Sequence, residues 1–309
     1  MAAVFREYAS VAQTGTSDDI ALPMEPSPKR RRMRGMTHAK LCKRILLGHG
    51  TGHREKYLPW LTLRRKNPSP RSNQVVSWMP PLNRTAHYFS RGEFHTALLL
   101  LWLGVHDLRE QFPLWPTPHP HPLDGLPHAP DKPHHWSRGL LAIATEANIV
   151  HGFEVGTRVP YIASLDLLAT VSLPGRTALA AFSSKPISDP NDEIGWRTLE
   201  RLELERRYTA DIGAFYFVSS SALIPLLTAG QLETWLDAST LHCAPHLLAS
   251  SREFAGIFND CTNLQINEAV GLAAASLSLP LDDAWLLFRH CACTVPGHRT
   301  STLIHRPAS

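Results

Sequence analysis

The sequence predicts an α/β core followed by a smaller C-terminal unit of the α+β type. Three patterns lead to this fold class. Residues 90–103 form a strongly apolar helical segment, and residues 159–185 read as two apolar strands joined by a turn. After residue 219 the pattern changes to short helical segments separated by turn residues. The 309-residue chain, 43% apolar, can bury one substantial core and a smaller second one.

The predicted helix 90–103 begins with a capping signal. Ser90 and Glu93 have the spacing of a capping box, in which the glutamate at the third helical position reaches back to the amide of the cap. A carboxylate in the first helical turn is fixed in place and can also face a metal ion. Glu93 is therefore a capping residue and, at the same time, a candidate metal ligand.

The predicted hairpin consists of strands 159–173 and 177–185. Pro174-Gly175 supplies the turn, because proline presets φ at the first central position and glycine tolerates a positive φ at the second. Pro186 stops the returning strand. With the turn centred there, cross-strand partners have numbers that sum to 349.

This register brings three polar side chains of the hairpin together. Asp166 faces Ser183, and Lys185 lies diagonally from Asp166 on the same face. An acid and a lysine held that close on a rigid sheet can bind a divalent metal and position a phosphate. The alternative is ordinary solvent-facing polarity, and a shift of one residue would move Asp166 to the other face.

Other segments complete the expected core. Residues 140–145 and 149–153 are strand-like, 197–208 predict a helix, and 214–218 read as a buried core strand. Glu203 and Glu205 on the helix lie near Lys185 in sequence. Their simplest interpretation is surface pairing with the neighbouring arginines.

Between helix and hairpin lies a loop rich in proline and histidine, residues 115–135. Its composition suggests a metal site, but alternating proline and histidine has no fixed ligand geometry. A surface loop near DNA or a partner is the alternative.

The C-terminal region predicts several helices and a terminal wing. The helical segments are 222–228, 231–238, 246–249, 252–258, 264–275 and 282–290. The last two, with the turn 276–280, could form a helix-turn-helix, and 293–305 could form a β-wing. Helix 282–290 is acidic at its start and otherwise mainly apolar, which suits protein contact better than reading of a DNA groove.

Charge and cysteine content indicate the cellular setting. The formal net charge is +4, and basic residues concentrate in 29–34, 40–44 and 54–71, where they could neutralise DNA phosphates. Residues 1–38 lack apolar periodicity and predict a disordered basic tail. Five cysteines, an odd number, argue against a disulfide framework, and no apolar run reaches membrane-spanning length. A cytoplasmic protein is expected.

A glutamate on a helix, an aspartate in a strand and a lysine two residues beyond a polar residue is the layout of metal-dependent nucleases with the restriction-endonuclease-like fold. Three further motifs resemble one family of that fold, TnsA, the endonuclease subunit of heteromeric bacterial transposases. The motifs are GHGTGHREKYLPWLT (48–62), DLREQFPL (107–114) and TLERLELERRY (198–208). The resemblance runs in order from about residue 40 to residue 218.

The resemblance assigns roles to individual residues. Glu93 matches the family's helical metal-binding glutamate, Asp166 its central aspartate and Lys185 its catalytic lysine, while Glu205 matches an acid near the active site. Two positions depart from the pattern. Ser183 stands where the family has glutamine, and a second acidic position, ten residues after the helical glutamate, is Leu103 here. Ser183 could still hold a metal through its hydroxyl or through a water molecule.

The resemblance also implies a function. The subunit would use Mg²⁺, with Mn²⁺ as a substitute, to cut the 5′ strands at transposon ends in bacterial cytoplasm. A DDE-type transposase would recognise the ends and join the 3′ strands, and an AAA+ ATPase regulator would dock on the C-terminal domain. The implied domains are a tail (1–38), a restriction-endonuclease-like catalytic domain (39–218) and a winged-helix domain (219–309).

Two other functions compete with this one. A catalytically weakened adaptor that bridges transposase and regulator is favoured slightly by Ser183. An independent restriction or repair nuclease is disfavoured, because no sizeable target-recognition domain is evident.

Overall fold

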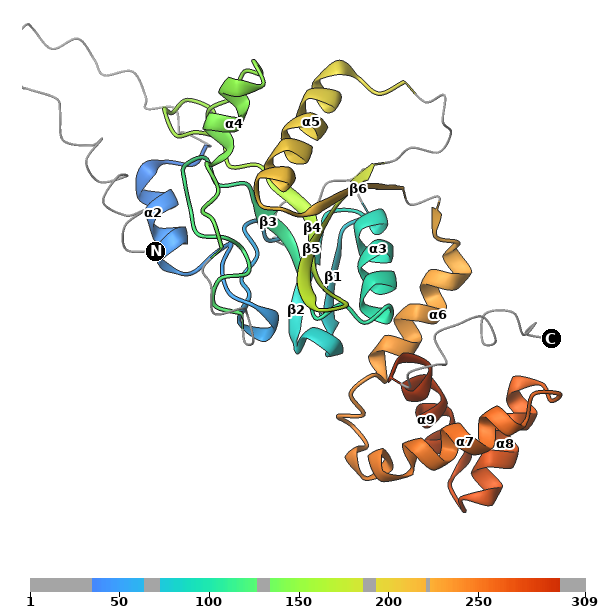
Figure 1. The fold of residues 1–309 in the computed structure, drawn as a ribbon. Coiled ribbons are helices and arrows are strands. Elements are labelled where there is room, and N and C mark those ends of the chain that lie inside the picture. The colour runs from blue at the N-terminus through green and yellow to red at the C-terminus, as the bar shows by residue number, and fades with distance from the viewer. Residues whose placement is uncertain (1–34, 64–72, 127–133, 186–192, 221–222, 295–309) are drawn as a thin grey trace, which may run out of the picture.

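A computed structural model describes residues 35–63, 73–126, 134–185, 193–220 and 223–294 of the chain. Its centre is a mixed four-stranded sheet in the order β3-β4-β5-β6 (Figure 1). The strands are β3 (Asp107–Pro113), β4 (Ser164–Leu173), β5 (Arg176–Lys185) and β6 (Phe215–Ser220). The first three run antiparallel, and β6 is parallel to β5. The fold is thus α/β, as expected.

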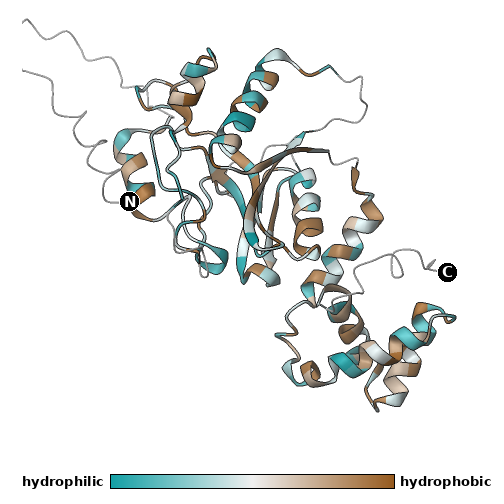
Figure 2. Ribbon diagram, viewed as in Figure 1, coloured by the Kyte–Doolittle hydropathy of each residue, from teal (hydrophilic) through white to brown (hydrophobic). Residues whose placement is uncertain are grey.

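Two helices cover opposite faces of this sheet. Helix α3 (Arg91–Trp102) packs on one face, and helix α5 (Trp196–Asp211), which connects β5 to β6, lies on the other (Figure 1). Both confirm the predicted helices 90–103 and 197–208. Helix α5 is hydrophilic along most of its length, whereas α3 is largely apolar (Figure 2). The difference follows from burial, because ten residues of α3 are buried and only three of α5 are.

Shorter elements surround the sheet on the N-terminal side. They are α2 (His38–Leu46), η1 (Arg54–Lys56), the hairpin of β1 (Val75–Met79) and β2 (Arg84–Tyr88), η2 (Pro80–Leu82) and α4 (Leu140–Glu146). The tail predicted for 1–38 falls outside the described residues up to residue 34, and Thr37 caps helix α2.

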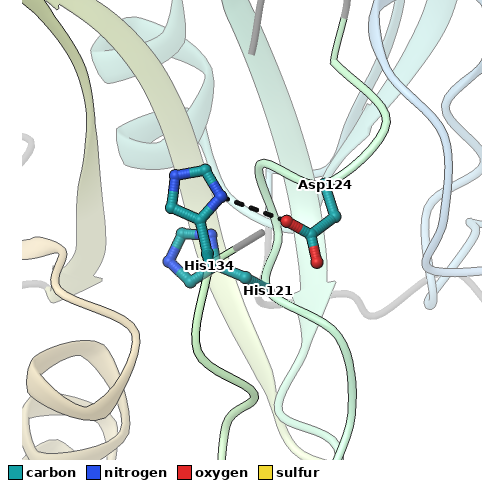
Figure 3. Close-up of side chains that lie close together, drawn as sticks. All are labelled: His121, Asp124 and His134. Carbon is teal, nitrogen blue, oxygen red and sulfur yellow. Dashed lines mark hydrogen bonds and ion pairs between the residues drawn. The ribbon is translucent and has the colours of Figure 1, made fainter. Parts of the chain in front are cut away.

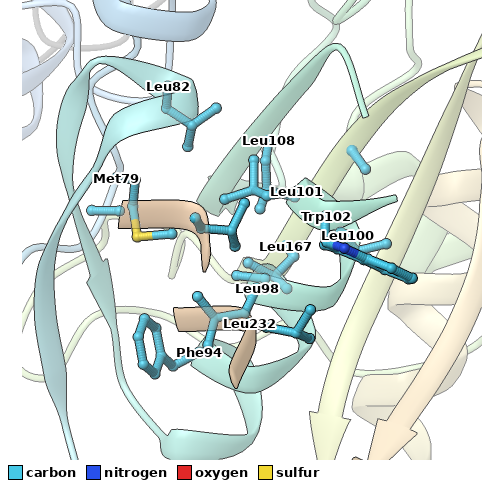
Figure 4. Packing of buried hydrophobic residues seen from close by; sticks show 14 of the residues in the cluster. Met79, Leu82, Phe94, Leu98, Leu100, Leu101, Trp102, Leu108, Leu167 and Leu232 are labelled. Atoms are coloured by element: carbon cyan, nitrogen blue, oxygen red, sulfur yellow. The ribbon is translucent and has the colours of Figure 1, made fainter. Parts of the chain in front are cut away.

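The main core lies between α3, the sheet and the β1–β2 hairpin (Figure 4). Helix α6 (Leu226–Asp237) adds Leu232 to this core, and the Trp102 indole donates a hydrogen bond of 3.0 Å to the carbonyl of Ala292 near the end of the last helix. The C-terminal region therefore packs directly against the helix that carries Glu93.

The hairpin register predicted from the Pro-Gly turn is confirmed. Strands β4 and β5 pair regularly from Leu173–Arg176 at the turn to Leu167–Phe182, and every pair sums to 349. The first strand begins at Ser164, five residues later than predicted. The regular pairing ends one position short of Asp166 and Ser183.

The side chains of β3 and β4 both switch from one face of the sheet to the other where the regular pairing of β4 with β5 ends. In a regular strand, residues two apart share a face. Yet Leu165 packs with the α5 side and Leu167 with the α3 side, and the same change separates Phe112 from Leu108 on β3. The switch occurs at Asp166 and at Gln111, which lies opposite it in the register and has a positive φ of 49°.

Three expectations about strands were wrong. Residues 140–145 lie in helix α4, because Leu140, Ile143 and Ala144 have the spacing of one helical face and are buried. Residues 149–153 form no strand and make only a single bridge, from Phe153 to Pro160. The strand at 214–218 exists as β6, but it is not buried: it forms the edge of the sheet, and Phe217 is 49% exposed while its ring stacks on Phe182.

In its described part, residues 223–294, the C-terminal region is helical. After α6 come η4 (Pro245–Ser250), α7 (Ser251–Asp260), α8 (Ile266–Ser276) and α9 (Leu281–Thr294). The segments predicted at 222–228 and 231–238 are represented by the single helix α6. The wing predicted for 293–305 lies outside the described residues except for its first two, which belong to α9.

Helices α7, α8 and α9 share a core of their own. Helices α8 and α9 meet at 114°, an angle usual for a helix-turn-helix. Helix α9 buries Leu287 and Phe288 in this core. Among the described residues, no single helix is long and apolar enough to cross a membrane, and α8 with α9 reaches that length only across their bend.

Candidate functional site

Glu93 is held at the start of α3 by four hydrogen bonds. The Ser90 hydroxyl accepts from the Glu93 amide at 3.2 Å, as in the predicted capping box. The Glu93 carboxylate accepts from the Phe89 amide at 2.9 Å, the Ser90 hydroxyl at 3.0 Å and the Gln111 side chain at 3.1 Å. The reciprocal bond thus goes to the residue before the cap, and the carboxylate is fixed and 5% exposed.

Asp166 and Lys185 lie together at the ends of β4 and β5. The Lys185 Nζ is 3.7 Å from Asp166 Oδ2, which also accepts a 2.7 Å hydrogen bond from the amide of Ser184. The two side chains are only 13% and 15% exposed. Within the described residues no donor contacts Asp166 Oδ1, so one oxygen of this carboxylate has no hydrogen-bond partner there.

The charge interaction between Glu93 and Asp166 indicates that Glu93 belongs to the same site. Burial, and secondly the charge of Asp166, raise the pKa of Glu93 from its ordinary 4.5 to about 7. Burial likewise raises the pKa of Asp166, against the lowering effect of Lys185 and the Ser184 amide. Two carboxylates in each other's field, partly removed from water, are stabilised when a cation binds between them. This donor set fits a hard divalent metal.

Gln111 links Glu93 to Ser164, two residues before Asp166 on β4, and sequence reasoning missed it. Its side chain donates to Glu93 and accepts a 2.9 Å bond from the Ser164 hydroxyl, while its backbone carbonyl accepts from Trp60 at 3.2 Å. A positive φ at a non-glycine residue costs energy, so these contacts hold the residue in place. The available signal was its position within the motif 107–114.

Ser183 was predicted to face Asp166, but the regular pairing ends one position earlier and its hydroxyl contacts Glu205. Its hydroxyl donates a short hydrogen bond to Glu205 on α5, and the Tyr216 hydroxyl contacts both at 3.2 and 3.1 Å. Arg201 pairs with the second oxygen of Glu205 at 2.8 Å. Glu205 is 1% exposed, so its interpretation as a surface pair was wrong. Its charge acts on Asp166, which places it beside the site.

Glu203 and Leu103 lie apart from this cluster. Glu203 pairs with Arg206 and Arg207 on the exposed side of α5, at 2.7 and 2.6 Å, as predicted. Leu103 caps the C-terminal end of α3, is 53% exposed, and stands ten residues, or about 15 Å along the helix axis, from Glu93. It adds no ligand.

The charged residues of the motif 107–114 mainly hold the fold. Arg84 of β2 forms a buried bidentate pair with Glu110 at 2.6 and 2.7 Å. Arg109, 1% exposed, donates to the carbonyl of Pro122 at 2.9 Å. The motif 48–62 packs closely against this strand at Gly50, where a Cβ would lie 2.4 Å from Pro113. These motifs support the strand that carries Gln111.

Comparison with known proteins shows which protein this chain resembles. No protein-family model matches it. Over 225 residues it is 29% identical to the Transposon Tn7 transposition protein TnsA of Escherichia coli, a stretch that covers 72% of this chain and 72% of that protein. The resemblance predicted from three ordered motifs is thereby confirmed, and the chain is a homologue of the transposition protein TnsA.

Proposed function

We propose that this TnsA homologue is a metal-dependent DNA endonuclease that hydrolyses the 5′ strands at transposon ends. The observation that carries the proposal is the convergence of two shielded carboxylates, Glu93 from α3 and Asp166 from β4, with Lys185 3.7 Å from the second. The finer fold assignment, a restriction-endonuclease-like core over 39–218, is part of the same proposal.

Each residue has a distinct role in this proposal. Glu93 and Asp166 hold the metal, with Ser183 or its neighbour Glu205 completing the ligand set. Mg²⁺, or Mn²⁺ in its place, supplies Lewis acidity toward a phosphoryl oxygen and lowers the pKa of a bound water when present. Lys185 orients the attacking water or stabilises the charge that develops on the phosphate. Gln111 keeps the Glu93 carboxylate pointed into the site.

The resemblance to TnsA also suggests the partners. The roles assigned to the site residues involve the metal and the phosphate and leave none for reading bases, so in this proposal a DDE-type transposase recognises the ends and joins the 3′ strands. Helix α2 presents the exposed basic side chains Lys40 and Lys43, which suit DNA phosphate. We assign residues 219–309 to a helix-turn-helix unit of winged-helix type that contacts protein, including an AAA+ regulator. The burial of α9 argues against reading of a DNA groove, because a groove-reading helix must be exposed.

The test uses transposon-end DNA, the partner transposase and Mg²⁺, with each strand labelled separately. Asp166→Ala should abolish 5′-strand cleavage and leave 3′-strand joining by the partner intact. Glu203→Ala, which removes a carboxylate from the exposed side of α5, is the matched control and should cleave normally. Normal double-strand excision by Asp166→Ala would overturn the site assignment.

The adaptor function remains the second candidate because of Ser183 and Leu103. The metal site lacks the family's glutamine and one of its acids, and the Ser183 hydroxyl is committed to Glu205. An adaptor predicts that wild type and Asp166→Ala support 3′ joining equally and that neither cuts the 5′ strand at any Mg²⁺ or Mn²⁺ concentration.

A further inference from the structure

The Pro/His-rich loop gathers three metal-ligating side chains away from the proposed nuclease site. His121, Asp124 and His134 each offer a ligand atom, and these atoms all lie within 4.8 Å of one another (Figure 3). The loop thus has the defined ligand geometry that its composition alone could not predict. We propose that these three residues bind a Zn²⁺ ion that cross-links the two ends of the loop beside the C-terminal end of α5.

The spacing of the ligand atoms suits a tetrahedral ion. The His134 Nδ1 and the Asp124 Oδ1 are 3.1 Å apart. Two ligands of one tetrahedral Zn²⁺ ion, each bonded at about 2.0 Å, are separated by about 3.3 Å. The His134–Asp124 pair therefore needs almost no movement. The His121 ring stacks on His134 with centroids 4.4 Å apart and has to turn toward the ion, and its ligand atom already lies within 4.8 Å of the other two.

The hydrogen bonds of His121 set its tautomer for metal binding. Its Nε2 lies 2.8 Å from the carbonyl of Ile212, which can only accept, so Nε2 carries the proton. The lone pair is then on Nδ1, which accepts a 3.2 Å bond from the Leu123 amide. A metal-bound histidine usually donates its other ring nitrogen to a carbonyl in this way. The ion would replace the longer bond from Leu123. Burial lowers the pKa of His121, which favours its neutral form.

Hydrogen bonds next to the cluster fix the position of this region against α5. Ser137 and Arg138 each place a donor 2.7 Å from the Asp211 carboxylate at the end of α5. The Tyr208 hydroxyl lies 2.7 Å from His119. A cavity of about 380 Å³, lined by His121 and His134 among others, gives access from solvent. Zinc would bond residues 121–124 to residue 134 within the loop, beside the hydrogen bonds that hold this region against α5.

The experiment separates this site from the nuclease centre. Metal content and Zn²⁺ titration calorimetry are measured on the full chain carrying Asp166→Asn, so that binding at the nuclease site is weakened throughout. Asp124→Asn and His134→Gln are added singly; both residues are partly exposed, so the fold should survive, which far-ultraviolet circular dichroism checks. His242→Gln, at an exposed histidine of the C-terminal region, is the matched control.

We expect one Zn²⁺ per chain in the Asp166→Asn background and in the His242→Gln control. Each cluster variant should lose at least tenfold in affinity, together with the rise in melting temperature that Zn²⁺ causes in the control. Co²⁺ in place of Zn²⁺ should give the visible absorption of a four-coordinate ion, absent in His134→Gln. Equal Zn²⁺ affinity in cluster and control variants, or no stoichiometric binding in the background protein, would overturn the proposal.

Discussion

Glu93 should make the metal-free protein less stable as pH rises, because this residue resists ionisation in the folded state. Its pKa of about 7 lies about 2.5 pH units above the ordinary value of 4.5. Between these two values the unfolded chain ionises first, so the folded state holds the extra proton and loses stability with rising pH. At about 1.4 kcal/mol per unit, the loss from this group approaches 3 kcal/mol between pH 4 and pH 8.

Glu93→Gln removes this titration and keeps an oxygen that can accept the Phe89 amide. The variant should therefore gain about 3 kcal/mol relative to wild type on going from pH 4 to pH 8, while its cleavage activity is lost. Urea unfolding in EDTA at several pH values measures the difference. Saturating Mg²⁺ at pH 8 should stabilise wild type and have little effect on the variant.

Glu203→Gln serves as the control for the pH series. The Glu203 carboxylate is about one-third exposed, and Arg206 and Arg207 hold its pKa low, so its removal should cost less than about 1 kcal/mol at neutral pH. A stability difference between wild type and Glu93→Gln that does not change with pH would refute the assignment of Glu93 as a carboxylate destabilised by burial. If Glu93→Gln is about 1 kcal/mol less stable than wild type and still cleaves DNA, Glu93 is only a helix-capping residue.

Two further predictions concern the neighbours of the metal ligands. Gln111→Ala removes a hydrogen bond to Glu93, so it should raise the Mg²⁺ concentration for half-maximal cleavage several-fold, whereas a purely structural role would lower only the melting temperature. Ser183→Gln should lower that Mg²⁺ concentration, because the longer side chain offers a carbonyl oxygen. Equal cleavage by both forms at the same low Mg²⁺ would show that position 183 is irrelevant and that the remaining ligand lies elsewhere, with Glu205 beside the site as the next candidate.

The sequence predicted those parts of the site that depend on local spacing. The Ser90–Glu93 spacing indicated the start of α3, and the Pro174-Gly175 turn set the register of the following strands. Both signals act over a few residues, so neighbouring positions suffice to define them. Residues 140–145 show the limit of such reasoning: a short apolar run fits a strand or a buried helix equally well until its packing is known.

The parts that could not be predicted depend on contacts between distant segments. At Asp166 the side chains of β4 switch from one face of the sheet to the other. This switch lies opposite Gln111, 55 positions earlier in the chain, which has a positive φ although it is not a glycine and therefore gives no sign of it in the sequence. The exposure of β6 depends on its place at the edge of the sheet, which its apolar composition does not reveal. The burial of Glu205 depends in the same way on how α5 lies across β5.

The change of faces is what lets one site collect side chains from both sides of the sheet. Glu93 comes from α3 on one face, and Glu205 comes from α5 on the other. An ordinary strand residue points to a single face, so it could approach only one of them. Asp166 lies where the alternation breaks. Its charge raises the pKa of Glu93, and the charge of Glu205 raises the pKa of Asp166. The strained backbone at Gln111 therefore occurs where it serves the proposed chemistry, which is where such strain is most often retained.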